Sequence, residues 1–504
     1  MDCILSIDLG TSMIKTALIN LSGKVIDKIE KPVISQSPSP YQVEQNPNQW
    51  WSIVQHEIIS LLKRNNLSSK KSQRYIKAIA CCGHSPSMVL VDNKGNPLRP
   101  AIIWQDRRAI KEAKFIENKI KEKNLKVNLP SPLTPHSRLP KVLWLLKNEP
   151  DIIKRTFFLL EPKDYINYKL TGVCKTSLWS SREFRDIQTG ELNNSILNIL
   201  KIPDYFIPEA VSSEKIIGTT QADIHQDSGL KEGIPVIAGE MDSISSIIGT
   251  GISGSYPGFN ISGTSDIIGI SIPKENLASM KNSSFYRYPF FADTCLLFGV
   301  TQSTGQSVVW FNKILQKKTN SIPTKDIIDN NNPLFFLPFL EGARTPHWDP
   351  DARGVLFGLN SKHSLKDIRN AIYLGIVFNL FENLQLLLNN HQLEMRKFAI
   401  KVSGGGANNH LLNQIKADVL GQTIIQTSVK ESGLLGNAIL ATLGLSVYKY
   451  KEAIDKMVHI ENTYYPEQGR QQFYQSQLYP IYKSLYLTNK INFKLISSIK
   501  NINI

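Results

Sequence analysis

The sequence predicts an α/β protein built from two related domains. Its 504 residues exceed the size of one ordinary core, so two domains of about 250 residues each are expected. Strand-like apolar runs alternate with helical patterns along the chain, which favours α/β architecture. A strand–turn–strand unit with a Gly-Thr-Ser turn occurs at residues 4–21 and again at 258–272. This internal duplication indicates two domains of one design.

Each expected element follows from a local pattern. Apolar runs at residues 4–9 and 14–21 flank the first Gly-Thr-Ser tripeptide, and runs at 258–262 and 267–272 flank the second, so each pair is predicted to form a hairpin. The remaining patterns predict strands at 76–82, 88–91, 235–238 and 398–402, and helices at 48–63, 109–123, 140–148, 245–248 and 410–420.

The glycine-rich stretch at residues 249–254 marks the expected domain boundary. We therefore expect an N-terminal domain at 1–249, a C-terminal domain at 250–485 and a basic C-terminal tail at 486–504.

Composition favours a soluble globular protein, because 41% of the residues are hydrophobic and 20% are charged. The most apolar stretch, at 372–388, is interrupted by polar residues and is interpreted as a buried helix rather than a membrane span. The N-terminus lacks a basic region and cleavage site of a signal peptide. The five cysteines include no C-x-x-C spacing and are expected to be reduced. These features predict a cytoplasmic protein with no membrane partner.

The net charge of +15 is spread along the chain instead of forming a basic patch. A nucleic-acid partner is therefore not expected. The sequence leaves monomer and homodimer both open.

Two loops have the composition of phosphate-binding turns. In Gly10-Thr11-Ser12 and in Gly263-Thr264-Ser265, glycine allows close approach of the backbone, and the hydroxyls add hydrogen-bond donors. For either tripeptide alone, an ordinary tight turn would be the favoured interpretation. Their recurrence at corresponding places favours a shared phosphate-binding role.

A third glycine cluster runs from Gly404 to Gly406, after the strand expected at 398–402 and before the helix expected at 410–420. Three glycines before a helix N-terminus allow a flat ring or a phosphate to lie against the backbone. The cluster is neither a Walker A loop nor a G-x-G-x-x-G fingerprint, so P-loop and Rossmann interpretations are weak.

Asp242 lies between the strand expected at 235–238 and the helical run at 245–248. A carboxylate at this position is well placed to abstract a proton at a cleft. It would serve equally well as a helix N-cap. The spacing alone does not choose between these interpretations.

Six short motifs follow one another along the chain: Ile7-Asp8-Leu9-Gly10-Thr11-Ser12, Ile103-Trp104-Gln105-Asp106-Arg107-Arg108, Gly239-Glu240-Met241-Asp242, Gly263-Thr264-Ser265, residues 336–346 and Gly404-Gly405-Gly406-Ala407. Taken together, they resemble the FGGY family of carbohydrate kinases from about residue 4 to 450, and the segment at 336–359 most resembles xylulokinases. The resemblance implies two actin-like, ribonuclease H-like domains with the active site in the cleft between them. It also implies that the N-terminal domain binds sugar and carries catalysis and that the C-terminal domain binds nucleotide.

The resemblance also implies cosubstrates and roles: ATP with Mg²⁺, and a small sugar as acceptor. Asp242 matches the family's general base, and residues 431–438 match a late helix that helps to close the nucleotide pocket. The other matched positions are Asp8, which would orient the metal through water, Gly10, Thr11 and Ser12 near the γ-phosphate, Gly263 and Thr264 in the second phosphate loop, and Gly405, Gly406 and Asn408 along the adenosine.

The sugar contacts depart from the family pattern. Xylulokinases carry Gln-Met-His and glycerol kinases Gln-Arg-Glu where this chain has His84-Ser85-Pro86, and proline offers no hydrogen-bond donor. Glu240-Met241 replaces the usual residues before the base, and an Asp expected near Ser177 is absent. His84, Ser85, Asp242 and Trp104 remain the expected sugar contacts, although Trp104 would fit a core position equally well.

The expected activity is phosphorylation of a ketopentose such as D-xylulose by ATP. Alternative acceptors are gluconate, L-fuculose, L-ribulose or another polyol. A non-catalytic, sugar-sensing pseudokinase and an actin-like ATPase or chaperone are the alternative functions. Sugar-stimulated ATP turnover would separate the three.

Overall fold

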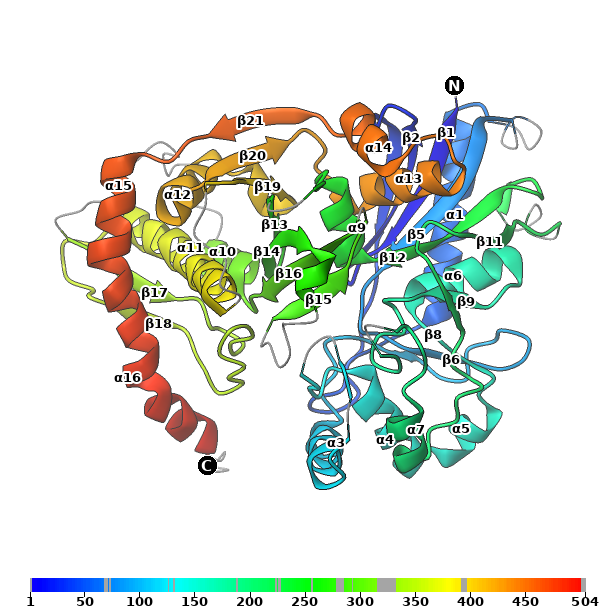
Figure 1. The fold of residues 1–504 in the computed structure, drawn as a ribbon, viewed down its shortest axis with the longest axis horizontal. Helices are drawn as coiled ribbons and strands as arrows, with labels where there is room; N and C mark the ends of the chain where they lie inside the picture. Colours follow the sequence, from blue (N-terminus) through cyan, green and yellow to red (C-terminus); the bar gives the residue numbers. More distant parts are fainter. Residues whose placement is uncertain are drawn as a thin grey trace. The chain divides into compact units, whose positions relative to one another are not determined.

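The computed structural model describes residues 2–67, 71, 74–125, 127–129, 132–186, 189–222, 224, 228–254, 257–277, 285–291, 293–314, 332–390 and 397–499. The chain forms two compact units, each with helices around a mixed sheet (Figure 1). Unit 1 comprises Met1–Gly249 and Glu431–Val458, and unit 2 comprises Thr250–Lys430 and His459–Ile504. The predicted two-domain α/β architecture is confirmed.

The sheet of unit 1 has six strands in the order β11-β12-β5-β1-β2-β3. The central neighbours β12, β5 and β1 run parallel, whereas the outer pairs are antiparallel. The strands span Ile216–Thr219 (β11), Pro235–Met241 (β12), Ile76–Gly83 (β5), Cys3–Leu9 (β1), Met13–Asn20 (β2) and Val25–Pro32 (β3).

Unit 2 repeats this order in its seven-stranded sheet, β21-β20-β19-β13-β14-β16, with β15 added at the edge beside β16. Each pair has the same direction as its counterpart in unit 1. The predicted duplication therefore extends over six strands. The strands span Ile460–Tyr464 (β21), Thr423–Thr427 (β20), Ala399–Ser403 (β19), Gly258–Ser262 (β13), Asp266–Pro273 (β14), Thr294–Val300 (β16) and Tyr286–Pro289 (β15).

The two predicted hairpins form where the Gly-Thr-Ser turns were expected. β1 pairs with β2 up to Leu9 opposite Ile14, and β13 pairs with β14 up to Ser262 opposite Asp266. The first turn requires glycine, because a Cβ atom at Gly10 would lie 2.7 Å from the Met13 carbonyl oxygen. Each tripeptide thus lies at the end of a central strand.

Smaller elements complete unit 1. The helices expected at 48–63, 109–123, 140–148 and 245–248 all form, with shifted ends. The helices are α1 (Pro47–Arg64), α3 (Ile110–Glu122), α4 (Arg138–Asn148), α5 (Pro150–Arg155), α6 (Pro162–Thr171), α7 (Asn194–Leu200), α9 (Asp242–Gly249), α13 (Ser432–Gly444) and α14 (Tyr450–Met457), and the short strands are β4 (Glu44–Gln45), β6 (Val89–Val91), β7 (Ala101–Ile102), β8 (Phe158–Leu160), β9 (Lys175–Ser177) and β10 (Glu209–Val211).

The helices of unit 2 surround α11 (Leu365–Asn390), which is long and apolar enough to cross a membrane by length and composition. Its apolar window is 89% buried inside the protein, as is typical of a core helix. The other elements are η1 (Lys274–Leu277), α10 (Thr304–Ile314), β17 (Phe335–Leu337), β18 (Val355–Phe357), η3 (Gly405–Asn408), α12 (His410–Leu420), α15 (Gln468–Phe473), the π-helical turn η4 (Tyr474–Leu478) and α16 (Tyr479–Ser498).

Residues 486–499 differ from the basic tail that was expected at 486–504. Helix α16 continues to Ser498, and its Tyr482, Tyr486 and Phe493 are buried in the core of unit 2. The Tyr486 hydroxyl also donates to Asp349 Oδ2 at 2.9 Å. Helix α16 therefore packs into unit 2 through its aromatic side chains, although its lysines favoured an exposed tail in the sequence.

Residues 431–458 also differ from expectation, because they belong to unit 1 and not to the nucleotide-binding domain expected at 250–485. Helix α13, orange in Figure 1, lies against the blue strand β1. Asn437 Nδ2 donates to the Ile7 carbonyl at 2.9 Å, and Ser6 Oγ donates to the Leu434 carbonyl at 2.9 Å. These buried hydrogen bonds tie the late helix to the first strand.

Helices α9 and α13 pack closely through glycine. A Cβ atom at Gly436 would lie 1.8 Å from the Ser245 carbonyl oxygen, and one at Gly249 would lie 2.0 Å from the Ser432 carbonyl oxygen. Asn437 Oδ1 accepts from Ser245 Oγ at 3.1 Å across the same contact. The first residues of both helices are thereby held next to the end of β1.

This packing predicts a large difference between two otherwise similar substitutions. Gly436→Ala should lower the free energy of unfolding by about 2 kcal/mol, because the added methyl overlaps the backbone of α9. Gly469→Ala, in α15 where nothing lies within 4 Å of an added Cβ, should stabilise by up to about 1 kcal/mol through helix propensity. Denaturant unfolding of both variants measures the difference. Equal stability of the two would contradict the packing described.

Candidate functional site

The candidate site of unit 1 lies at the carboxyl ends of three neighbouring strands. Leu9 of β1 is paired with Gly83 of β5, and Gly83 is paired with Met241 of β12. The His84 N–H extends this ladder by donating to the Leu9 carbonyl at 3.0 Å. The residues that follow these strands therefore leave one edge of the sheet together, where ligands bind in open α/β sheets.

Asp8 lies one residue before the end of β1. Its Oδ1 accepts from Cys82 Sγ at 3.3 Å, and burial raises its pKa, although the charge of Lys15 opposes the rise. A Cβ atom at Gly433 would lie 3.2 Å from Asp8 Oδ2. Glycine in the first turn of α13 thus keeps the space beside this carboxylate clear, and the helix N-terminus favours negative charge there.

Asp242 is the first residue of α9. Its Oδ1 accepts the N–H of the next residue, Ser243, at 2.6 Å, while Oδ2 has no hydrogen-bond partner among the residues described. Burial and then the charge of Asp8 raise the pKa of Asp242 to about 8, against the stabilising Ser243 N–H. A carboxylate with this pKa is a stronger base than usual, and it loses that capacity as the pH falls below about 8.

His84 lies behind this edge. It is 1% exposed, its ring contacts Trp50 edge to face with centroids 5.5 Å apart, and its Nδ1 forms a 2.7 Å hydrogen bond with Ser87 Oγ. Burial lowers its pKa to about 3, so the imidazole is neutral. This environment favours a packing role, and the contact of His84 with sugar stays a prediction.

Trp104 connects the turn after β5 to the first Gly-Thr-Ser loop. Its backbone N–H donates to Ser87 Oγ at 3.0 Å, and its indole N–H donates to Thr11 Oγ1 at 2.7 Å. Gln45 Nε2 holds the same loop by donating to the Thr11 carbonyl at 2.8 Å. Trp104 is therefore fixed by hydrogen bonds at both of its N–H groups.

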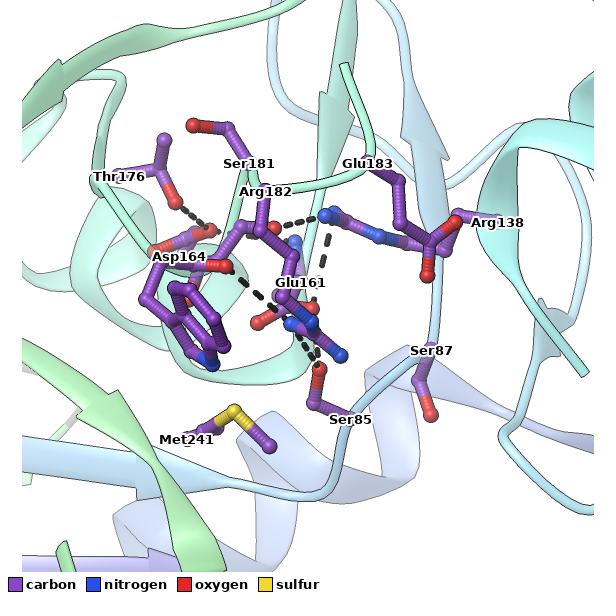
Figure 2. A network of polar contacts seen from close by, with 12 residues as sticks. Ser85, Ser87, Arg138, Glu161, Asp164, Thr176, Ser181, Arg182, Glu183 and Met241 are labelled. Carbon is purple, nitrogen blue, oxygen red and sulfur yellow. Dashed lines mark hydrogen bonds and ion pairs between the residues drawn. The ribbon is translucent and has the colours of Figure 1, made fainter. Parts of the chain in front are cut away.

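Ser85 contacts two charged residues that the sequence analysis missed. Its Oγ donates to Glu161 Oε1 at 2.6 Å and accepts from Arg182 Nη1 at 3.2 Å (Figure 2). Glu161 follows the short buried strand β8, as Asp242 follows β12, and this pattern could have identified it. Arg182 lies in a turn without periodicity, where no sequence signal indicates it.

A buried ion pair at the start of α6 contacts β12. Lys163 Nζ lies 2.5 Å from Asp164 Oδ1, which belongs to a carboxylate that also accepts from Thr176 Oγ1 at 2.7 Å. Lys163 also donates to the Ala238 carbonyl of β12 at 3.2 Å. Because every charge here is paired, burial is tolerated and the end of β12 is held in place.

Glu240 belongs to the same support. Its Oε1 accepts from Ser177 Oγ and from the Met241 N–H, each at 3.0 Å. The family pattern places an Asp near Ser177, and this chain lacks it. The carboxylate at this place is instead Glu240 of β12, which contacts Ser177. Glu240 is 1% exposed and stabilises the backbone immediately before Asp242.

Unit 2 carries its predicted residues on two loops that meet at Ser262. A Cβ atom at Gly404 would lie 2.5 Å from the Ser262 carbonyl oxygen, and one at Gly406 would lie 2.7 Å from Ser262 Cβ. Gly404 also has a φ of 88°, which favours glycine. The loop at 404–406 therefore packs directly against Ser262, the residue before the loop at 263–265, and only glycine at 404 and 406 allows this approach.

A buried network fixes the end of β13 below these loops. Lys416 Nζ donates to Ser262 Oγ at 2.7 Å and to Asn260 Oδ1 at 2.6 Å. Ser262 Oγ donates in turn to Asp266 Oδ2 at 3.0 Å, and Thr304 Oγ1 donates to Asp266 Oδ1 at 2.8 Å. Asp266 is consequently committed to this support and is a poor candidate for a base.

The outer residues of the unit 2 loops remain accessible. Gly405 and Asn408 are exposed, and nothing lies within 4 Å of a Cβ atom built on Gly405. Thr264 contributes its carbonyl to the Gln306 N–H of α10 at 3.1 Å. A flat ring or phosphate could therefore approach the backbone at 405–408 without displacing a side chain.

The structure thus gathers the predicted residues into two groups. Unit 1 brings Asp8, Ser85, Trp104, Asp242 and the loop at 10–12 to one sheet edge, and unit 2 brings Gly263, Thr264, Gly405, Gly406 and Asn408 to the corresponding edge. Within the described ranges there is no cluster of three or more His, Cys, Asp or Glu side chains suited to a metal ion.

Comparison with known proteins gives matches over nearly the whole chain. The N-terminal domain of the FGGY family of carbohydrate kinases matches residues 3–249, and its C-terminal domain matches residues 258–445. A xylulose kinase from Bacillus subtilis (strain 168) is 30% identical, with 99% of this chain and 100% of that protein covered.

Two solved structures share the fold. A ligand-bound xylulose kinase from Lactobacillus acidophilus superposes with a TM-score of 0.85 at 23% identity, covering 98% of this chain and 100% of that one. A gluconate kinase from the same organism superposes with a TM-score of 0.86 at 23% identity, covering 98% of this chain and 99% of that one.

Proposed function

The chain belongs to the FGGY family of carbohydrate kinases, which transfer a phosphoryl group from ATP to an alcohol group, and we propose that its acceptor is a ketopentose such as D-xylulose. The 30% identity to a xylulose kinase over the full chain supports this choice of sugar. The observation that carries the catalytic assignment is Asp242, a carboxylate with an unpartnered oxygen at the strand edge that also presents Ser85 and Trp104.

Asp242 is the proposed proton acceptor. Phosphoryl transfer requires a base within hydrogen-bond reach of the attacking hydroxyl, together with precise positioning. The raised pKa of Asp242 suits a group that must take a proton from an alcohol. Glu240 and Asp266 are less suited, because hydrogen bonds to their neighbours already engage both carboxylates.

The backbone loops are the proposed phosphate and nucleotide contacts. The turn at 10–12 offers N–H groups and hydroxyls beside Asp8. On unit 2, the loop at 263–265 offers the same groups, and the loop at 404–408 offers backbone N–H groups and the Asn408 amide. Trp104 orients Thr11 through its indole N–H. Its ring also offers an apolar face to the sugar.

Asp8 is the proposed site for Mg²⁺. This ion commonly uses one or two carboxylates together with water and substrate phosphates, so a dedicated cluster of protein ligands is not required. The clear space that Gly433 leaves beside Asp8 Oδ2 suits a hydrated ion. When bound, Mg²⁺ would neutralise charge on the phosphate oxygens.

Gluconate is the second candidate acceptor, because the gluconate kinase superposes as well as the xylulose kinase. A comparison of kcat/KM for D-xylulose, L-ribulose, L-fuculose, D-gluconate and glycerol tests the assignment of the sugar. D-xylulose is expected to give the highest value. A higher value for any other member would replace it.

The base assignment predicts that Asp242→Asn lowers kcat by about 100-fold or more, because an amide cannot accept the proton. The KM for ATP should change little. Asp204→Asn is the matched control, since Asp204 is an exposed carboxylate of unit 1. Near-normal turnover by Asp242→Asn would refute the assignment.

The nucleotide assignment predicts that Gly405→Val raises the KM for ATP about tenfold by filling the space where the nucleotide approaches. Gly405 is a cleaner position than Gly10, because no protein atom lies near its added Cβ. Circular dichroism and thermal unfolding should be unchanged. Gly469→Val, equally uncrowded but in α15, is the control. Unaltered ATP kinetics in Gly405→Val would show that this loop is only a turn.

A further inference from the structure

Three segments of unit 1 meet at Ser85. The serine follows β5, Glu161 precedes α6, and Arg182 belongs to the turn at 178–184. As Figure 2 shows, Ser85 lies between the two charged side chains, donating to Glu161 Oε1 and accepting from Arg182 Nη1. The hydroxyl proton of Ser85 is therefore already engaged.

The two charged residues retain unused hydrogen-bonding groups. The Glu161 carboxylate lies at the N-cap of α6, and its Oε1 is 3.6 Å from Arg138 Nη1. Its Oε2 is buried and has no hydrogen-bond partner among the described residues. Arg182 donates through Nη1 to Ser85 and to the Trp179 carbonyl, at 3.2 Å each, and its Nε–H and Nη2–H groups have no acceptor in the same part of the chain. Glu161 is 1% exposed and Arg182 is 6% exposed. Leaving a buried carboxylate oxygen such as Glu161 Oε2 unpaired is costly unless a ligand satisfies it.

Both residues border the sheet edge that carries Asp242. A Cβ atom at Gly83 would lie 3.3 Å from Pro162 Cβ, so the start of α6 covers the end of β5. Gly83 is in turn paired with Met241, the residue before Asp242. Asp242 itself lies close enough to Glu161 and Arg182 for both charges to act on its pKa. A sugar at Asp242 would therefore lie within reach of this group.

The chemistry of the pair selects among ligands. Arg182 offers two parallel N–H donors, and Glu161 offers an acceptor, which together match hydroxyl groups that both accept and donate. A carboxylate ligand would suit the arginine alone. It would also meet the negative charge of Glu161, so the pair of Arg182 and Glu161 favours neutral hydroxyls over an acid group.

We propose that Arg182 and Glu161 determine sugar specificity by binding two neighbouring hydroxyls of the acceptor, distinct from the hydroxyl that is phosphorylated. This inference rests on the kinase function proposed above and deepens it. Ser85 then acts as a bridge that positions the pair, and Pro86 needs no donor. The polar residues missing after β5 are supplied by two other segments of the chain.

The test measures steady-state kinetics of the full chain with MgATP and the most efficient sugar among D-xylulose, L-ribulose, L-fuculose and D-gluconate. Arg182→Gln and Glu161→Gln should each raise the KM for the sugar about 10- to 100-fold, the loss of a hydrogen bond to a charged group. The KM for ATP should stay within about twofold.

Two charged residues next to Arg182 in sequence, Glu183 and Arg185, provide matched controls. Arg185 donates to Ser181 Oγ and to the Gly190 and Pro208 carbonyls, and Glu183 accepts from the Leu139 N–H. Neither touches Ser85. Arg185→Gln and Glu183→Gln should leave the KM for the sugar unchanged. A sugar KM that rises equally in the controls and the test variants would overturn the proposal.

A second measurement uses the unaltered protein, because substitutions of buried charges can impair folding. Single-deoxy analogues that lack either of the two bound hydroxyls should lose about 100-fold in kcat/KM. Arg182→Gln or Glu161→Gln, where folded, should reduce that loss to about threefold. Acceptance of every single-deoxy analogue that keeps the phosphorylated hydroxyl would overturn the proposal, as would preference for D-gluconate with Arg182 as its determinant.

Different results would contradict the specificity assignment and the kinase function. Sugar-stimulated turnover with sugar kinetics that do not depend on Arg182 or Glu161 would remove only the specificity assignment. Absence of sugar-stimulated turnover with every sugar tested would contradict the proposed function itself, and the specificity assignment with it.

Discussion

The hydrogen-bond ladder that joins β1, β5 and β12 in parallel is the constraint on which the site of unit 1 depends. Paired residues of neighbouring strands lie about 4.8 Å apart, so the ends Leu9, Gly83 and Met241 bring the residues that follow them to one edge. A slip of one residue would turn each side chain to the opposite face of its strand. The positions of Asp8 and Asp242 are thus properties of strand register.

Burial at this edge explains both the reactivity and the support around it. The same loss of water that raises the pKa of Asp242 also makes any unpaired ion costly. Buried charges near this edge are therefore paired, as Lys163 is with Asp164, or accept hydrogen bonds, as Glu240 does at the end of β12. Arg182 and Glu161 differ from these pairs, because groups on each remain available to a ligand.

Much of the fold could be predicted because its signals are local. The Gly-Thr-Ser turns lie where two apolar runs meet, and the duplicated hairpins were visible as a repeat. Residues 431–458 could not be assigned correctly, because their place depends on hydrogen bonds from Ser6 and Asn437 between ends of the chain far apart in sequence. The lysines of α16 likewise favoured the prediction of a basic tail, although the aromatic side chains of the same helix pack into unit 2.

The candidate site divides in the same way. Asp8, Asp242 and the glycine loops lie in short motifs, so sequence could indicate them. The partners of Ser85 are brought together only by folding, since Arg182 lies in a turn and Glu161 is indicated by nothing more than its place after a short strand. For His84, burial against Trp50 was not visible in the sequence, and it changes the role that the residue can be expected to have.

The most direct test of the central claim is a simultaneous measurement of ADP and of phosphate ester, by coupled assay and phosphorus NMR, with and without D-xylulose. If the protein is a kinase for D-xylulose, ADP should form only when D-xylulose is present, and one molecule of phosphate ester should form for each ADP. ATP consumption that is independent of every sugar tested, with inorganic phosphate as the product, would contradict the account.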